Sequence, residues 1–400
     1  MLELFTFSLT DLWIIGTILA LFFIWFIPFQ IRYGRPLRTA RKKNKNVNDE
    51  IDSTSLPSLP PVSVIIYSGG KPQELETILP SVLSQEYPDY EVIVVNDGGD
   101  DDTNDVIKRF SNEHKNLKST FTPQNARYLS RKKLAFTLGI KAAQNEILLM
   151  LESDSNPISS NWIKSMVRNY SANTEIVLGF TAYTDCSKFR DKLIAYDRLI
   201  DGLRYISAAL IHKPYSADGR NLSYRKSLFL RRKGYYEWLD LKDGEDDLFI
   251  NSAANKENTK VEYSSESLTS LAHYPSFNEW TDERIERLAT STHYRNFGPL
   301  AGFKVISFNE RLSVLADIAA IVICIFGNWL ISILAGLLLI ARCIVKYRIF
   351  YRSSRMLQQK SSVGYLPILE IVRPVVNLYL KFYHLLHHNQ DYTFQIDNEK

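Results

Sequence analysis

Cysteine is scarce in this chain, and neither sign of charge is in large excess. The three cysteines among 400 residues, Cys186, Cys324 and Cys343, are too few and too scattered for a disulfide framework or a zinc site. The formal net charge of +4 gives no reason to expect a nucleic-acid partner. The sequence also lacks internal repeats and low-complexity tracts. The composition therefore argues against a disulfide scaffold, a repeat protein and a nucleic-acid binder.

An apolar stretch near the amino terminus is long enough to cross a bilayer. Residues 12–29 carry no charge, and the basic residues lie behind them rather than in front, the reverse of a signal peptide. These basic residues are Arg32, Arg35, Arg38, Arg41, Lys42, Lys43 and Lys45. We interpret residues 1–32 as an uncleaved anchor, and the positive-inside rule then places the chain behind it in the cytoplasm.

A second apolar region, residues 312–345, is too long for one comfortable span, and Gly327-Asn328 interrupts it. One interpretation is a hairpin of two short helices, and the other is a single long tilted helix that would place the carboxyl terminus outside. Basic residues follow at Arg348, Arg352, Arg355 and Lys360 and favour the hairpin. We therefore expect a transmembrane hairpin over residues 301–346. Behind it we expect a cytoplasmic amphipathic tail, residues 347–400, with residues 365–383 on or beside the membrane.

Strands and helices alternate in the polar middle of the chain. A basic and polar linker, residues 33–60, leads to a β-branched run at 62–67, a helical pattern at 72–85 and a second strand at 91–95. This βαβ spacing predicts parallel strands whose loops share one edge of a sheet. Further helices are expected at 102–111, 131–144 and 191–210, with a strand at 175–180. Residues 61–300 are thus predicted to form one α/β domain.

The apolar run at residues 147–151 predicts a strand buried on both faces, and Glu152 and Asp154 follow it at once. Side chains two apart on an extended backbone point the same way, so these two can share one cation at the carboxyl end of the strand. That edge is where open α/β sheets bind ligands. The alternative is a solvated acidic turn that Pro157 ends. Tyr67 and Asp97 also fall at carboxyl ends of predicted parallel strands.

The residues from 61 to 295 resemble family 2 glycosyltransferases of the GT-A fold, especially the membrane-anchored bacterial members. The resemblance rests on six segments in the right order. They are Val62-Ser63-Val64-Ile65-Ile66, Gln85-Glu86-Tyr87-Pro88 with Tyr90 to Asp97, Lys132-Lys133 with Ala135, Glu152-Ser153-Asp154, Gly219-Arg220-Asn221-Leu222-Ser223-Tyr224-Arg225 and Gly244-Glu245-Asp246-Asp247. The implied fold is a mostly parallel sheet flanked by helices.

The resemblance also implies a role for each matched residue in an inverting sugar transfer. Asp97 would accept a hydrogen bond from the nucleotide base with Tyr67 near it, and Lys133 or Lys132 would approach the diphosphate. Glu152 and Asp154 would hold Mg²⁺ or Mn²⁺, and Asp246 would be the general base. Arg220, Asn221 and Glu245 would contact the acceptor. Without the resemblance, the pattern favours plain surface lysines at Lys132 and Lys133.

Three departures from the family pattern bear on this reading. Glu152 stands where the metal motif usually has aspartate, and Tyr67-Ser68-Gly69-Gly70 replaces a polar pair. The segment typical of processive enzymes appears as Arg284-Ile285-Glu286-Arg287-Leu288 without its tryptophan, which favours the addition of one or a few sugars. Arg284 and Arg287 could face the diphosphate, or they could pair with Asp282, Glu283 or Glu286 on the helix surface.

The sequence thus predicts a multi-pass protein of the inner (cytoplasmic) membrane with a cytoplasmic GT-A domain. It would move a sugar from a nucleotide-diphospho-sugar to a hydroxyl of a lipid-linked or surface-glycan acceptor. Two alternatives stay open. One is a degenerate, non-catalytic member that binds a nucleotide or a partner, and the other is a processive polysaccharide synthase, which would need more spanning helices.

Overall fold

The structure, a computed structural model, describes residues 7–49, 59–97, 101–123, 130–185, 187–271, 274, 276–325, 328–359 and 363–386. The turn residues Gly98 and Gly99 and the tail beyond residue 386 lie outside these ranges. The centre of the molecule is a seven-stranded sheet in the order β3-β2-β1-β4-β8-β6-β9. Its strands are β1 (Val62–Ser68), β2 (Tyr90–Asn96), β3 (Leu117–Phe121), β4 (Ile147–Glu152), β6 (Ile176–Leu178), β8 (Leu222–Arg225) and β9 (Thr259–Val261).

Strands β1 to β4 run parallel, as the βαβ spacing predicts, whereas β8 is antiparallel to both β4 and β6. A second sheet of three short strands, β5 (Ser155–Pro157), β10 (Thr269–Leu271) and β7 (Thr181–Tyr183), lies beyond β4. The sequence did not predict β3, β5, β7, β8, β9 or β10. Most of these strands have only three or four residues, too few for an alternating pattern to stand out.

Helices cover both faces of the large sheet because successive side chains of its buried strands point to opposite sides. Val64 and Ile66 of β1 pack with α3 (Pro72–Leu83), α4 (Asp101–Glu113) and α6 (Trp162–Val167) on one face. Ile65 packs with α5 (Arg131–Ala142) on the other face. Gly139 lets α5 approach closely, since a Cβ there would lie 2.7 Å from Ile65 Cγ2.

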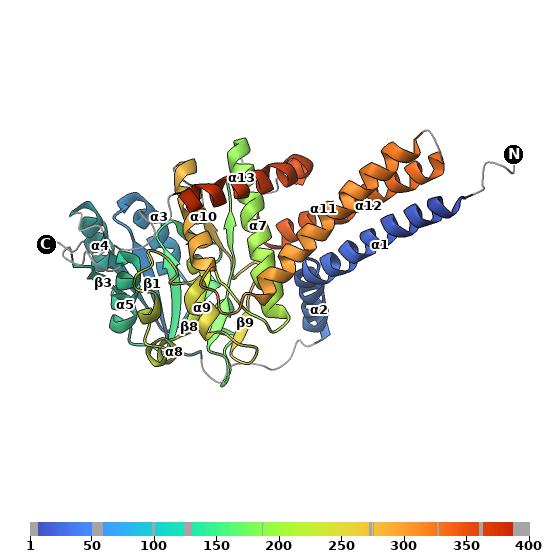
Figure 1. The fold of residues 1–400 in the computed structure, drawn as a ribbon. Coiled ribbons are helices and arrows are strands. Elements are labelled where there is room, and N and C mark those ends of the chain that lie inside the picture. Colours follow the sequence, from blue (N-terminus) through green and yellow to red (C-terminus); the bar gives the residue numbers. More distant parts are fainter. Residues whose placement is uncertain are drawn as a thin grey trace.

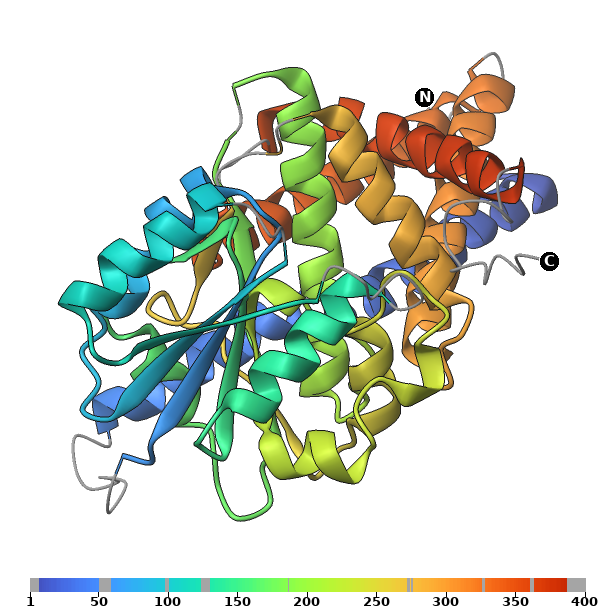
Figure 2. The same cartoon turned by 90° about the vertical axis from the view of Figure 1, so that its left-hand side faces the viewer.

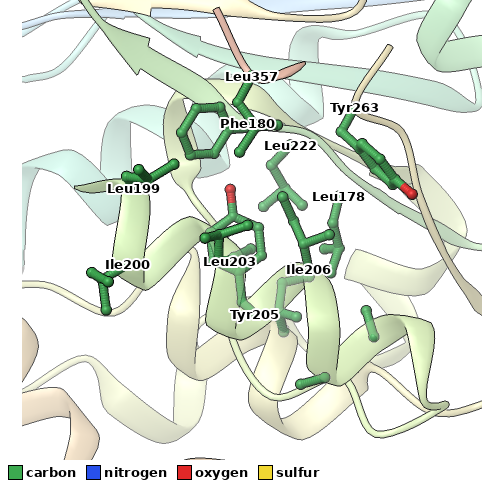
Figure 3. Packing of buried hydrophobic residues seen from close by; sticks show 14 of the residues in the cluster. Leu178, Phe180, Leu199, Ile200, Leu203, Tyr205, Ile206, Leu222, Tyr263 and Leu357 are labelled. Atoms are coloured by element: carbon green, nitrogen blue, oxygen red, sulfur yellow. The ribbon is translucent and has the colours of Figure 1, made fainter. Parts of the chain in front are cut away.

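The long helix α7 (Phe189–Leu210) completes the core on that second face. Figure 3 shows three residues of α7, Leu199, Leu203 and Ile206, against Leu178 of β6, Leu222 of β8 and Phe180, which follows β6. Shorter elements follow: η2 (Gly219–Asn221), α8 (Lys226–Arg231), η3 (Tyr236–Trp238), α9 (Asp247–Ala253) and α10 (Phe277–Ser291). Figure 2 shows α7 and α10 side by side, with α13 (Leu366–Leu386) across their upper ends.

Three helices form a bundle that projects from this body (Figure 1): α1 (Leu9–Arg32), α11 (Gly298–Cys324) and α12 (Trp329–Met356). Ile18, Ala320 and Ala335 pack in its interior, while large apolar side chains such as Phe23, Leu315 and Leu337 face outward. By length and composition, α1 and α12 could each cross a membrane. The buried pair Asp317 and Arg342, 3.0 Å apart, joins α11 to α12.

Two packed helices, α11 and α12, lie where the transmembrane hairpin is expected, but they extend from residue 298 to residue 356, and of the two only α12 is long and apolar enough to cross a membrane. The second helix continues to Met356, ten residues into the segment expected to be tail, and α13 follows the short η4 (Val363–Tyr365). Within the segment expected to be a linker, residues 35–49 form helix α2 (Arg35–Asp49). Spaced arginines and lysines favour helix as readily as an extended linker, because straight-chain residues have high helix propensity.

Candidate active site

The carboxyl ends of β1, β2 and β4 bring three predicted site residues together. Tyr67 of β1 lies in register with Glu152 of β4, and its hydroxyl donates to Asp97 Oδ2 at 3.0 Å. Arg131, in the first turn of α5, holds the other oxygen, with Nη2 3.0 Å from Oδ1. Burial and the negative charge of Asp97 raise the pKa of Tyr67 well above its ordinary value, so its hydroxyl stays a donor.

A charged cleft opens in front of these strand ends. Its larger part is a cavity of about 230 Å³, and a second part of about 180 Å³ adjoins it because the two share Glu152, Arg220, Glu279 and Glu283 in their walls. Asp246 lines the first part and Asp154 the second, so these acids share one cleft as the sequence predicts. Among the described residues, the larger part is lined by three cations (Lys132, Arg220, Arg287) and eight carboxylates (Glu152, Asp243, Glu245, Asp246, Glu279, Asp282, Glu283, Glu286).

The adjacent lysines of α5 have different positions. Lys132 reaches into the cleft, where its Nζ lies 3.1 Å from Glu152 Oε1 and 2.6 Å from Glu245 Oε1. Although burial opposes its charge, these carboxylates raise the pKa of Lys132 well above the usual value. Lys133 turns into the protein and donates to the carbonyls of Trp238 and Leu241 at 2.6 and 2.7 Å. Of the two lysines proposed for the diphosphate, the geometry supports only Lys132.

Asp246 precedes α9 and is held by three donors. Its Oδ2 accepts from the Gly219 N–H and from Arg287 Nη2, both at 2.8 Å, and its Oδ1 accepts from the Asp247 N–H. Gly219 allows a close approach to Asp246, since a Cβ at this position would lie 3.2 Å from the Asp246 Cβ. These contacts fix the Asp246 carboxylate in one orientation at the wall of the cleft.

The residues proposed to contact the acceptor do not act as a group. Arg220 lines both parts of the cleft, but its guanidinium pairs with Asp154, with Nε 3.0 Å from Oδ1 and Nη2 2.9 Å from Oδ2. Asn221 is fully buried and donates to the carbonyls of Phe180 and Ser267. The prediction that Asn221 contacts the acceptor substrate was therefore wrong. Glu245 lines the cleft, and burial next to Asp243 raises its pKa well above the ordinary value.

The two arginines of α10 diverge, although they are three residues apart. Arg287 reaches Asp246 in the cleft, while Arg284 turns toward α7 and pairs with Asp197 Oδ2 at 3.1 Å and with Asp201. Arg373 of α13 meets the same two aspartates. The prediction that Arg284 faces the diphosphate was therefore wrong, because α7 offers it two carboxylates on the side away from the cleft.

Several cleft residues escaped sequence reasoning. Glu279, Glu283 and Glu286 recur at i, i+4 and i+7 on α10 and present one acidic face to the cleft. Lys71 and Glu74, 3.2 Å apart, line the smaller part beside Tyr274. The spacing of the glutamates was a usable signal, but an acidic helix face is more commonly a solvated one.

The mostly parallel sheet flanked by helices, with a carboxylate pair after its central strand and a further acidic segment across one cleft, has the architecture of the GT-A fold. In agreement, the chain superposes on a mannosyltransferase from Pyrobaculum calidifontis, solved with GDP-Man and Mn²⁺, with a TM-score of 0.50 over 90% of this chain and 99% of that one. At 16% identity this likeness concerns the fold alone.

Residues 63–230 match the model of glycosyl transferase family 2. Glycosyltransferase AglE of Haloferax volcanii is 31% identical over 131 residues, 32% of this chain and 41% of the relative. A poly-beta-1,6-N-acetyl-D-glucosamine synthase of Staphylococcus epidermidis is 31% identical over 94 residues, 24% of this chain and 22% of the relative. The chain thus matches less than half the length of either protein.

Proposed function

We propose that the chain is an inverting glycosyltransferase that moves a sugar from a nucleotide-diphospho-sugar to a hydroxyl of a lipid-linked or surface-glycan acceptor. The observation that carries this proposal is the single cleft shared by Glu152, Asp154 and Asp246. A transfer of this kind needs a cation site for the diphosphate and a base for the acceptor, close together.

The carboxylates of the cleft suit Mg²⁺ or Mn²⁺, because these hard cations prefer carboxylate oxygens as ligands and the cleft wall holds more acidic than basic side chains. Among the described residues, no group of three or more His, Cys, Asp or Glu is arranged to hold a metal ion by itself. Glu152 and Asp154 would therefore hold the cation together with phosphate oxygens of the donor. When bound, such a cation stabilises the charge that develops on the leaving diphosphate.

The protein's own residues supply the remaining chemistry. Asp246, fixed by Gly219 and Arg287, would take the proton of the acceptor hydroxyl as that oxygen attacks the sugar. Lys132 would face the leaving diphosphate with a charge that its carboxylate neighbours maintain. The transfer is a single displacement, so no covalent sugar–enzyme intermediate forms and the sugar inverts.

The helices support a site at a membrane surface. Helix α1 ends at Arg32, next to Tyr33, which packs against the body of the molecule, and Arg35, Arg38 and Arg41 follow on α2. The positive-inside rule places this end of α1, and hence the domain, on the cytoplasmic side of an inner membrane. We propose a multi-pass protein with few spans, which favours a non-processive enzyme over a polysaccharide synthase.

The test uses the full chain in detergent micelles with a panel of UDP- and GDP-sugars and Mn²⁺. Release of nucleoside diphosphate is expected from at least one donor, and Asp246→Asn is expected to lower the rate roughly 10²–10⁴-fold because the base is lost. Asp105→Asn, on the exposed side of α4, is the control and should leave the rate unchanged. No metal-dependent release from either native chain or variant would favour a non-catalytic nucleotide-binding protein, which the pairing of Arg220 with Asp154 also motivates.

A further inference from the structure

The guanidinium of Arg220 lies at the carboxylates that would hold the metal ion. Its Nε lies 3.0 and 3.1 Å from the two oxygens of Asp154, and its Nη2 lies 2.9 Å from Oδ2. The same Nη2 is 3.0 Å from Glu283 Oε2 and 3.8 Å from Glu152 Oε2. Only 11% of the side chain is exposed, so these are strong, poorly screened contacts.

A guanidinium and a divalent cation cannot both be stable at this position. A cation on Asp154 would stand within a few ångströms of Arg220, and like charges so close in a buried site repel strongly. We propose that Arg220 is the resident cation of the cleft, and that a divalent cation arriving with a nucleotide diphosphate exchanges with it on Asp154. The inference rests on the proposed function, in which Glu152 and Asp154 are the cation ligands.

The surrounding contacts allow the side chain to move while the backbone stays in place. The Arg220 carbonyl accepts from Thr269 Oγ1 at 3.2 Å, and the Arg220 N–H donates to Asp218 Oδ1 at 3.2 Å. Gly219 in turn holds Asp246, so an exchange confined to the Arg220 side chain leaves the base where it is. The backbone at Gly219 therefore holds the proposed base, while the side chain of the next residue, Arg220, contacts the proposed cation ligand Asp154.

Glu283 of α10 provides a second partner for the displaced guanidinium. Burial alone would raise the pKa of Glu283, but Arg220 and Arg198 hold it well below the usual range. An ionised Glu283 can keep Arg220 at the cleft wall, where the guanidinium can turn to the phosphate oxygens that arrive with the metal. After the exchange the cleft holds both the divalent cation and the Arg220 guanidinium, and both positive charges can face the negative phosphate oxygens.

The exchange predicts how Mn²⁺ binds to the full chain, measured by the electron paramagnetic resonance signal of free Mn²⁺. The native chain should bind Mn²⁺ weakly without nucleotide, and UDP or GDP should strengthen binding roughly tenfold or more. Arg220→Gln should bind Mn²⁺ alone roughly tenfold tighter than the native chain, because the competing charge is gone. The effect of the nucleotide should shrink accordingly, and Arg220→Lys should fall between the two.

Two controls locate the effect. Arg295→Gln changes an exposed arginine that pairs with Glu237 and should bind Mn²⁺ like the native chain. Adding Asp154→Asn to Arg220→Gln should remove the gain in affinity. Melting temperatures show which variants are folded, and if Arg220→Gln does not fold, Arg220→Lys decides the question.

The outcomes separate this inference from the function on which it rests. If folded Arg220 variants bind Mn²⁺ no tighter than the native chain while nucleotide and Mn²⁺ still bind together, the exchange is wrong and the transferase proposal survives. If no variant binds Mn²⁺ or nucleotide, both are wrong.

Discussion

Charged side chains are buried in two regions of this molecule, and the two regions balance them differently. In the bundle and among the helices next to it, opposite charges are nearly equal in number: Asp317 pairs with Arg342, Lys346 with Glu310 and Glu370, and Arg284 and Arg373 share Asp197 and Asp201. In the larger part of the cleft, the described residues place eight carboxylates against three cations. Matched pairs can satisfy one another and stabilise the fold, whereas an excess of one sign is costly unless a ligand of opposite charge binds. We therefore interpret the balanced charges near the bundle as structural and the excess carboxylates of the cleft as a site for a positively charged ligand.

The largest effect on stability is expected in the bundle. Asp317→Leu leaves Arg342 buried without its carboxylate, and breaking such a pair costs about 3–5 kcal/mol of folding free energy. The double variant Asp317→Leu/Arg342→Met should recover most of this loss. Thermal melting of the full chain in detergent measures both. A single variant that melts like the native chain would mean that these matched charges are not structural.

The adjacent lysines of α5 allow the same comparison within one helical turn, because Lys133 has a structural contact and Lys132 lines the cleft. Lys133→Met leaves the carbonyls of Trp238 and Leu241 without their donor and should cost about 1–3 kcal/mol in stability. Lys132→Met should cost less stability than Lys133→Met, because its partner carboxylates line the open cleft, and should weaken nucleotide-sugar binding roughly 10- to 100-fold, the loss of one charged hydrogen bond. Calorimetric titration and melting curves check both, and equal effects on stability would remove the distinction.

A smaller, pH-dependent effect is expected beside Asp246, the proposed base. Burial, and then the charge of Asp246, raise the pKa of Asp247 to about 6 in the folded chain from 3.8. Because the folded state binds this proton more tightly, the stabilising contribution is complete below about pH 4 and is lost as the pH rises through about 6. Asp247→Asn should flatten the melting temperature of the chain between pH 4 and 7. An unchanged slope would show that Asp247 titrates normally.

Much of the sheet could be predicted from the sequence because its central strands are continuous apolar runs ending in polar residues. The runs at β1, β2 and β4 placed Tyr67, Asp97 and Glu152 at one edge, and the register confirms that Tyr67 lies beside Glu152. The gathering of Asp246 with Asp154 followed from the resemblance to a known family, since no local pattern relates residues 92 apart in the chain.

The errors at Lys133, Asn221 and Arg284 have a common cause. Sequence shows that a residue is polar, but not whether its partner is a ligand or a buried group of the protein itself. Asn221 meets two carbonyls and Arg284 two aspartates, all distant in sequence. Arg220 was assigned to the acceptor for the same reason, because its partner Asp154 lies 66 residues away.

The most direct test of the account is the melting temperature of the full chain titrated with UDP- and GDP-sugars, with and without Mn²⁺. A ligand that binds only the folded state raises the melting temperature, so at least one donor should do so with Mn²⁺ present. The shift should vanish in Glu152→Gln/Asp154→Asn. If no nucleotide sugar shifts the native chain, or if the double variant responds equally, the excess carboxylates of the cleft do not form the donor site.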